Sequence, residues 1–163
     1  MASKRNLDEK NEPSAKKARI ESRIHTACIK GQTKTVLKLL NGSTKINPKE
    51  INKRRTLHKV ARKGNVRIVK ELLKHGVNIN ADNKEFLKPL HIASQKGHNE
   101  VVIELLKNGA EVNTVDWYQC TPLYYACYLG KLEVVKILSK NKADVNLQNE
   151  NNGWFPLYVC YCS

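Results

Sequence analysis

Three histidines come first among residues that could do chemistry, because imidazole is both a common metal ligand and a common general base. His25, His58 and His91 follow one another at equal intervals along the chain. If each occupies the same place in a stacked unit, neighbouring rings lie about 10 Å apart, the spacing of packed helices. One ion cannot bridge that distance. We therefore expect no metal site, and we expect each ring to hydrogen-bond the backbone of a neighbouring loop.

Other catalytic signatures are absent from the sequence. It contains no G-x-S-x-G, no H-E-x-x-H, no phosphate-binding G-x-x-x-x-G-K and no C-x-x-C. We expect a protein that is not an enzyme and needs no cofactor. The five cysteines are an odd number without zinc spacing, which predicts free thiols in a reducing compartment. The last four residues formally fit a prenylation signal, but without an aliphatic pair before the final serine, so we expect Cys160 to be a core residue.

The elements that must position these residues follow the same period. Gly31, Gly64, Gly97 and Gly130 recur at the interval of the histidines, and a second series recurs in step with them: Asn47, Asn80, Asn113 and Asn146. After each glycine, apolar residues spaced three and four apart predict an amphipathic helix. Before it, a shorter apolar segment predicts a first helix, which begins at a proline in the third and fourth units. The sequence therefore predicts an all-α chain of repeated helix pairs.

Composition agrees with a folded chain outside the membrane. The 163 residues are 40% hydrophobic and 27% charged, with a net charge of +14. The stretches free of charged residues are shorter than the roughly 20 apolar residues of a membrane-spanning helix. Positions 1–22 lack the apolar core of a secretory signal.

The segment Lys88-Pro89-Leu90-His91-Ile92-Ala93-Ser94-Gln95-Lys96-Gly97-His98, with residues 101–113 after it, resembles the ankyrin repeat. The resemblance covers about residues 23–161, with four full repeats and a truncated fifth that begins near Glu150. It implies a curved solenoid of stacked helix pairs with short projecting hairpins and a concave face that binds proteins. The hairpin glycine of the family is replaced by Lys53, Phe86 and Gln119. The fifth repeat stops at Ser163 without a second helix, and three explanations stay open: it caps the fourth repeat, the chain is truncated, or another protein covers it.

Positions 1–22 are predicted to form a disordered basic tail, with the repeat domain at 23–163. Two basic clusters in the tail are separated by residues 6–15, the spacing of a bipartite nuclear import signal whose extended chain contacts a carrier. This signal comprises Lys4, Arg5, Lys16, Lys17 and Arg19. It predicts a nuclear protein, and a merely solvated tail in a cytoplasmic protein is the alternative.

Charge along the repeats is uneven, since residues 23–82 carry 15 basic and 3 acidic side chains whereas residues 83–163 carry 8 of each. Basic residues at positions that line the groove in the second repeat give way to aromatic residues in the fourth. The candidate partner-binding residues are Lys53, Arg54, Arg55, Lys59, Arg62, Lys63, Trp117, Tyr118, Tyr125 and Tyr128.

This surface suits an acidic or mixed protein partner, with charge for steering and aromatic side chains for anchoring. Nucleic acid is the alternative, its phosphates contacting the basic residues of 53–74. Within the family, inhibitors of NF-κB-type transcription factors and host-directed effectors are two candidate subtypes. The basic groove is poorly suited to masking a basic import signal, which disfavours the inhibitor.

Overall fold

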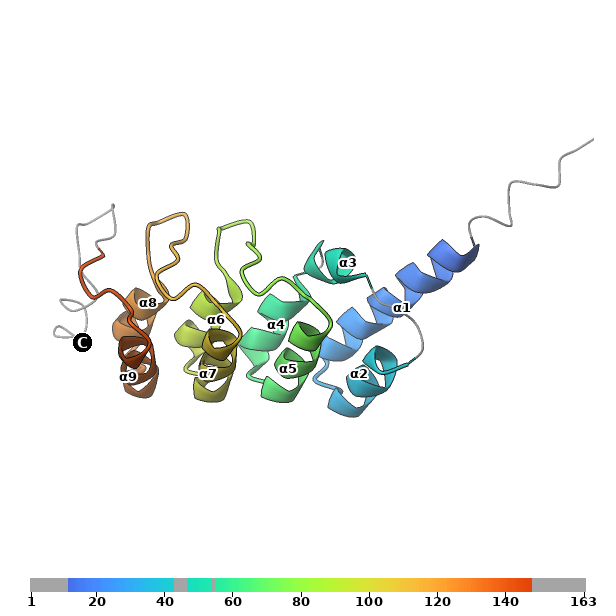
Figure 1. The fold of residues 1–163 in the computed structure, drawn as a ribbon, viewed down its shortest axis with the longest axis horizontal. Coiled ribbons are helices and arrows are strands. Elements are labelled where there is room, and N and C mark those ends of the chain that lie inside the picture. The colour runs from blue at the N-terminus through green and yellow to red at the C-terminus, as the bar shows by residue number, and fades with distance from the viewer. Residues whose placement is uncertain (1–11, 43–46, 54, 148–163) are drawn as a thin grey trace, which may run out of the picture.

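The computed structural model describes residues 12–42, 47–53 and 55–147. Helices account for the regular structure of these ranges, which contain no strand. In chain order the helices are α1 (Glu12–Ile29), α2 (Thr33–Leu40), α3 (Pro48–Lys53), α4 (Thr56–Lys63), α5 (Val66–Lys74), α6 (Pro89–Lys96), α7 (Asn99–Lys107), α8 (Pro122–Tyr128) and α9 (Leu132–Lys140). Four antiparallel pairs stand side by side in a row, with the connecting loops projecting from one side (Figure 1). The all-α solenoid is thus confirmed, and the fifth repeat lies outside the described residues.

Each pair turns at the periodic glycine. Gly64 and Gly97 end α4 and α6 in the left-handed conformation, with φ of 74° and 73°. A left-handed residue at this position lets backbone N–H groups bond the last carbonyls of the helix, and glycine adopts it without a steric penalty. At α5 the Asn65 side chain accepts a hydrogen bond from the Ile68 N–H and so caps the following helix.

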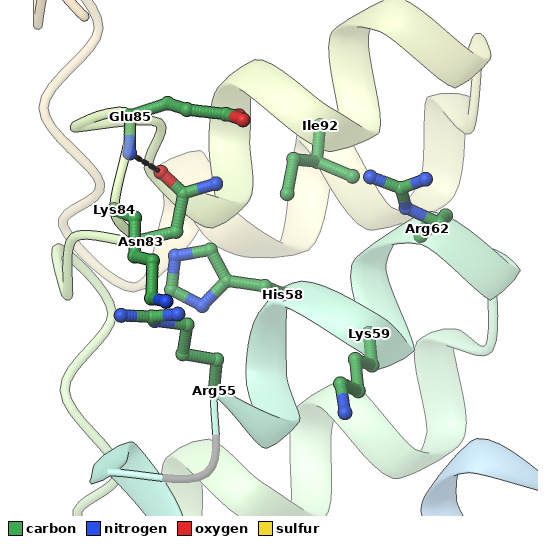
Figure 2. Close-up of a pocket in the computed structure, with 8 residues that line it drawn as sticks. All are labelled: Arg55, His58, Lys59, Arg62, Asn83, Lys84, Glu85 and Ile92. Atoms are coloured by element: carbon green, nitrogen blue, oxygen red, sulfur yellow. Dashed lines mark hydrogen bonds between the residues drawn. The ribbon is translucent and has the colours of Figure 1, made fainter.

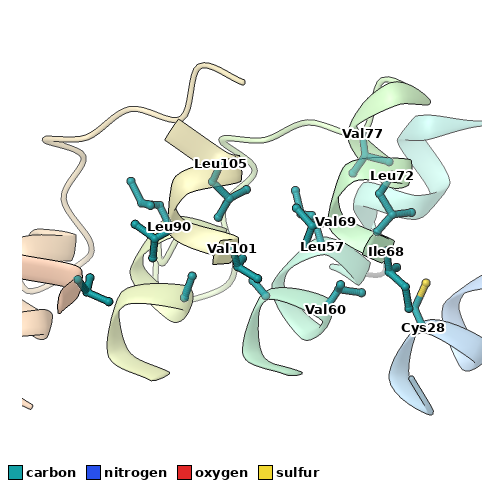
Figure 3. Packing of buried hydrophobic residues seen from close by; sticks show 14 of the residues in the cluster. Cys28, Leu57, Val60, Ile68, Val69, Leu72, Val77, Leu90, Val101 and Leu105 are labelled. Carbon is teal, nitrogen blue, oxygen red and sulfur yellow. The ribbon is translucent and has the colours of Figure 1, made fainter. Parts of the chain in front are cut away.

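The core is one continuous cluster along the row of pairs. Figure 3 follows it from Cys28 through Val60 to Leu90, and all three side chains are buried. Burial of each large apolar side chain contributes about 1.5–3 kcal/mol. Because part of that burial is against the neighbouring pair, each unit depends on the next for its stability.

The outer face of the first pair is less buried than the equivalent face of the second pair. Ile68 and Leu72 of α5 are fully buried, whereas the equivalent residues of α2 are Thr35, which is exposed, and Leu39, which is only partly buried. No helix pair precedes α1 and α2 in the described chain to cover them. A polar outer face at the terminal repeat is what keeps such a stack soluble.

The predicted disordered tail needs a correction. Helix α1 begins at Glu12 and runs without interruption past residue 22, so 12–22 is helix and joins the first repeat. The buried Glu21 side chain accepts a hydrogen bond from the Asn47 N–H at 2.8 Å, which ties α1 to the start of α3. Residues 1–11, with the first basic cluster of the import signal, lie outside the described residues.

A second correction concerns the hairpin predicted at Lys53, the residue directly before Arg54 and Arg55. The structure has helix α3 there instead, ending at Lys53, and Arg54 is outside the described residues. In the next two repeats, Asn83 and Asp116 hold the projecting loop, because each Oδ1 accepts two backbone N–H bonds at 2.8 to 2.9 Å.

The second repeat has Glu50 at the position of Asn83 and Asp116. Glutamate is longer by one methylene and is a better helix former than either residue. Pro48 at the first position of α3 and the Asn47 side chain, which accepts the Lys49 N–H at 3.1 Å, complete a helix start. The local sequence therefore forms a turn of helix rather than the side-chain-braced loop.

Cysteine chemistry is mixed. Cys28 is a buried free thiol, and the Sγ of the buried Cys120 lies 3.6 Å from the Tyr118 carbonyl oxygen. Cys127 is disulfide-bonded, which corrects the prediction of free thiols throughout. Burial raises the pKa of the Cys28 thiol to about 12.

Across the described ranges, no helix is long and apolar enough to cross a membrane.

Candidate partner-binding groove

The face of α4, α6 and α8 that carries the predicted groove is built from equivalent positions in successive repeats. Lys59, Ile92 and Tyr125 form one row, and Arg62, Gln95 and Tyr128 form a second. The first helices of neighbouring pairs pack together, so each row runs across the stack (Figure 1). Along these two rows the residues change from basic at α4 to aromatic at α8.

At its basic end the groove deepens into a hollow of about 440 Å³ between α4, α6 and the loop before α6. Eight residues line it: Arg55, His58, Lys59, Arg62, Asn83, Lys84, Glu85 and Ile92 (Figure 2). We call this space the basic hollow. Three of the predicted binding residues, Arg55, Lys59 and Arg62, meet there, while Lys63 is exposed on α4 and does not line it.

Sequence reasoning missed Lys84 and Glu85, which come from the neighbouring repeat. The loop at Asn83 folds over α4, so its residues reach a hollow whose floor belongs to another unit. The sequence does show a charged pair, Lys84 and Glu85, at the tip of a predicted loop. Only the way in which one repeat packs on the next reveals that this pair reaches the basic helix α4.

The cations of the basic hollow lack carboxylate partners. In the part of the chain that the structure describes, none of Arg55, Lys59, Arg62 and Lys84 takes part in an ion pair, and the Nζ atom of Lys59 lies 3.3 Å from Nε2 of His25. Four other lysines, Lys70, Lys74, Lys88 and Lys136, each lie within 4 Å of a carboxylate. Among the described residues, the three cations Arg55, Arg62 and Lys84 of the hollow therefore have no carboxylate within ion-pair distance.

His58 and His91 play the predicted structural role. The Nε2 atoms lie 3.0 Å from the Leu87 carbonyl and 3.1 Å from the Cys120 carbonyl, each in the loop of the next repeat. Burial lowers the pKa of both rings, to about 4 for His91. At His25, the ring Nδ1 lies 2.8 Å from the Thr56 hydroxyl oxygen. Among the described residues no cluster of His, Cys, Asp and Glu could hold a metal ion.

The Nδ1 atoms of His58 and His91 differ in their hydrogen bonding. Lys88 N–H donates to His91 Nδ1 at 3.0 Å. The equivalent N–H, that of Arg55, bonds instead at 2.8 Å to the carbonyl of Asn52, in the last turn of α3. Arg55 has a φ of 51°, and the buried Nδ1 of His58 has no hydrogen-bond partner within the described ranges. The start of α4 thus carries backbone strain and an unsatisfied ring nitrogen next to the basic hollow.

Aromatic side chains cluster at the loop tips beyond the hollow. Trp117 is 67% exposed and its ring lies 5.6 Å from that of Phe86, which is 47% exposed. The Trp117 N–H donates to the Glu85 carbonyl at 3.1 Å, which joins the two loops. Tyr118 is also exposed. Sequence reasoning missed Phe86 as a binding residue, although its replacement of the hairpin glycine marks a large apolar side chain at a projecting tip.

The two predicted tyrosines of α8 have different roles. Tyr125 is partly buried and donates a hydrogen bond to Asp116 Oδ2 at 2.5 Å, so its hydroxyl braces its own loop. Burial and this bond raise the pKa of Tyr125 well above its ordinary value. Tyr128 is 58% exposed and stacks on Tyr124 with ring centroids 6.2 Å apart. Of the two, Tyr128 is the one with an accessible face for a partner.

The helix pairs and their spacing match a known family over most of the chain. The family model of ankyrin repeats, described as three copies, matches residues 24–116 and 87–149. Among curated proteins, none matches the chain in sequence.

Proposed function

Because the chain belongs to the ankyrin-repeat family, whose repeats form protein–protein interaction modules, we propose that its partner is an acidic protein segment bound along the concave face. The observation that carries this proposal is the set of uncompensated cations at the basic hollow. Charges held without internal counterions attract and orient an acidic partner, and the attraction weakens as salt rises.

The aromatic end of the groove supplies the second half of the binding surface. Trp117 and Tyr128 are exposed and belong to the residue types enriched in binding hot spots. An acidic segment can therefore place carboxylates at α4 and an apolar side chain near α8. Such a mixed segment uses both ends of the face at once.

The proposed site is tested by charge reversal. We expect Arg55→Glu with Arg62→Glu to weaken partner binding about tenfold or more and to flatten its salt dependence. The matched control is Lys107→Glu with Lys140→Glu, which changes the charge equally at exposed residues of α7 and α9. Partners are captured from nuclear extract with the purified full chain and identified by mass spectrometry. Equal loss in both double variants would place the site elsewhere.

Nucleic acid remains the competing partner in this experiment. Two of the basic residues of 53–74, Lys70 and Lys74, lie 3.6 Å and 3.3 Å from Glu104 and Glu71. Those carboxylates reduce the attraction for phosphates along the second helix. Partners that survive nuclease treatment support the protein-binding proposal, and loss of all partners on nuclease treatment contradicts it.

We also propose that the basic residues near the N-terminus direct the protein to the nucleus. Lys16, Lys17 and Arg19 lie in α1, so a carrier that requires an extended chain must unwind the start of this helix. Replacing the three with alanine should move a reporter fusion of the full chain to the cytoplasm. Alanine at Lys30, Lys34 and Lys38, which are exposed, is the control. An unchanged nuclear signal in the first variant contradicts the proposal.

A further inference from the structure

The basic hollow has a charge balance that a single carboxylate does not match. Four cations line it, Arg55, Lys59, Arg62 and Lys84, and the one acid is Glu85. Figure 2 shows Arg55 and Lys84 on the loop side of the hollow and Lys59 and Arg62 on the α4 side. A ligand that enters between them meets positive side chains from two repeats. Its best match is a group with more than one negative charge and several acceptor oxygens.

The second observation is the unsatisfied group in the wall. His58 is 4% exposed and lines the hollow, and its Nδ1 has no hydrogen-bond partner in the described part of the chain. Buried polar atoms are nearly always paired, so an unpaired one needs an explanation. Because Nε2–H donates to the Leu87 carbonyl, this Nδ1 is an acceptor, and it would be satisfied by an N–H donor of a bound peptide rather than by a phosphate oxygen. Arg55 adds a left-handed backbone that glycine adopts more readily, with φ of 51°. Strain and unpaired groups of this kind concentrate at binding sites, where the structure is arranged for a ligand rather than for stability.

We propose that the basic hollow binds the phosphate group of a phosphorylated side chain on the partner protein. This rests on the proposed function and narrows it from an acidic segment to one carrying a phosphate monoester. A phosphoserine or phosphothreonine brings a charge between about −1.5 and −2 and three strong acceptor oxygens. The planar guanidinium groups of Arg55 and Arg62 can each bond two of those oxygens, which a lysine cannot do.

The loop that carries Lys84 also indicates which kind of residue flanks the phosphorylated one in the partner. Lys84 lines the hollow, and Phe86 stands two positions later in the same loop and contacts the ring of Trp117. A bound phosphate at the hollow therefore places the flanking residues of the partner near this aromatic pair. We expect a large apolar residue close to the phosphorylated one.

The test uses defined probes and the full chain. Three degenerate peptide libraries, with a fixed central phosphoserine, glutamate or serine, are titrated by fluorescence polarisation at constant ionic strength. We expect the phosphoserine library to bind about tenfold more tightly than the glutamate library. Arg62→Ala and Lys84→Ala should each cancel most of that difference. Lys107→Ala, which removes an exposed cation of α7, should preserve it. Thermal melting confirms that the variants fold.

Inorganic phosphate separates a free anion from a peptide-borne one. We expect it to compete only weakly, because it lacks the flanking residues that reach Phe86 and Trp117. Competition as strong as that of the phosphoserine peptides would overturn the assignment to a phosphorylated partner.

Two other outcomes overturn the inference in distinguishable ways. If the phosphoserine and glutamate libraries bind equally and Arg62→Ala weakens both, the proposal of a phosphate site is refuted. The proposal of an acidic protein partner then still stands. Binding that neither Arg62→Ala nor Lys84→Ala affects, or no binding of the phosphoserine library, removes the hollow as a phosphate site. In that case the charge-reversal capture decides separately whether the groove binds proteins.

Discussion

Acid should destabilise this solenoid through His91, and the size of the effect follows from the geometry of the ring. His91 is fully buried in α6. Its Nε2–H donates to the Cys120 carbonyl and its Nδ1 accepts the Lys88 N–H at 3.0 Å. Both nitrogens are thus used by the neutral ring, and a second proton on Nδ1 must break the bond to Lys88. Burial is the main reason that the pKa falls from 6.5 to about 4, and the nearby Asp116 charge opposes part of the decrease.

The sign and window of the effect follow from this lowered pKa. As pH falls, the unfolded chain takes up the proton first, so the stabilisation is complete above about pH 6.5 and is lost progressively down to about pH 4. Between pH 8 and pH 5, a pKa of 4 folded and 6.5 unfolded corresponds to about 2 kcal/mol of lost stability, or about a 30-fold change in the folding equilibrium. His58, whose pKa is also lowered by burial, acts in the same direction.

The assay is urea unfolding at pH 8 and pH 5, with the wild type and His91→Gln compared. The wild type should lose about 2 kcal/mol more than His91→Gln between the two pH values, because glutamine does not titrate. Ser94→Ala in the same helix is the control, since it alters a buried residue without removing a titrating group. Its pH dependence should match the wild type. If His91→Gln loses as much free energy as the wild type on acidification, the reasoning about His91 is refuted.

Three further predictions concern stability. Gly64→Ala should cost about 1–2 kcal/mol from its left-handed backbone plus the displacement of His98, whose Nδ1 would lie 2.6 Å from the new Cβ; Gly31→Ala, with open space around it, should cost only the first part, as thermal melts of the two will show. Asp116→Ala should cost about 2–4 kcal/mol by urea unfolding because three hydrogen-bond donors lose their acceptor, and Asp116→Asn should cost clearly less. Ser94→Ala should raise stability by about 1 kcal/mol, because the buried Ser94 hydroxyl has no partner within the described ranges; a lower midpoint in urea would contradict this.

The repeated part of the fold could be predicted because identical physical demands recur once in every unit. Each unit needs a left-handed residue after its first helix, and Gly64 and Gly97 supply it. Each unit also needs its buried ring to reach the next loop, and His58 and His91 do so. Because the same requirement recurs in each repeat, the same residue type recurs at the same interval. Comparing the sequence with itself reveals that interval.

Helix α3 could not be predicted in this way because it depends on a single departure from the period. Expecting a hairpin there followed from the neighbouring repeats, whereas Glu50 in place of Asn83 or Asp116 removes the short side chain that braces the loop. The set of residues that line the basic hollow could not be predicted from the sequence either. Lys84 and Arg62 belong to different units, and only the stacking of α4 against the next loop brings them to one space.

The second repeat, in which helix α3 replaces the projecting loop, is also the repeat that carries the basic end of the groove. Where the repeat is regular, the polar groups at the helix start are satisfied, as the Lys88 N–H and His91 Nδ1 are by each other. Where α3 replaces the loop, Arg55 turns into a left-handed conformation, its N–H bonds elsewhere and His58 Nδ1 loses its partner. The same change places the Arg55 side chain at the basic hollow. The irregular second repeat therefore differs from its neighbours in its helix start, and the left-handed Arg55 and the unpaired His58 nitrogen both lie at the basic hollow.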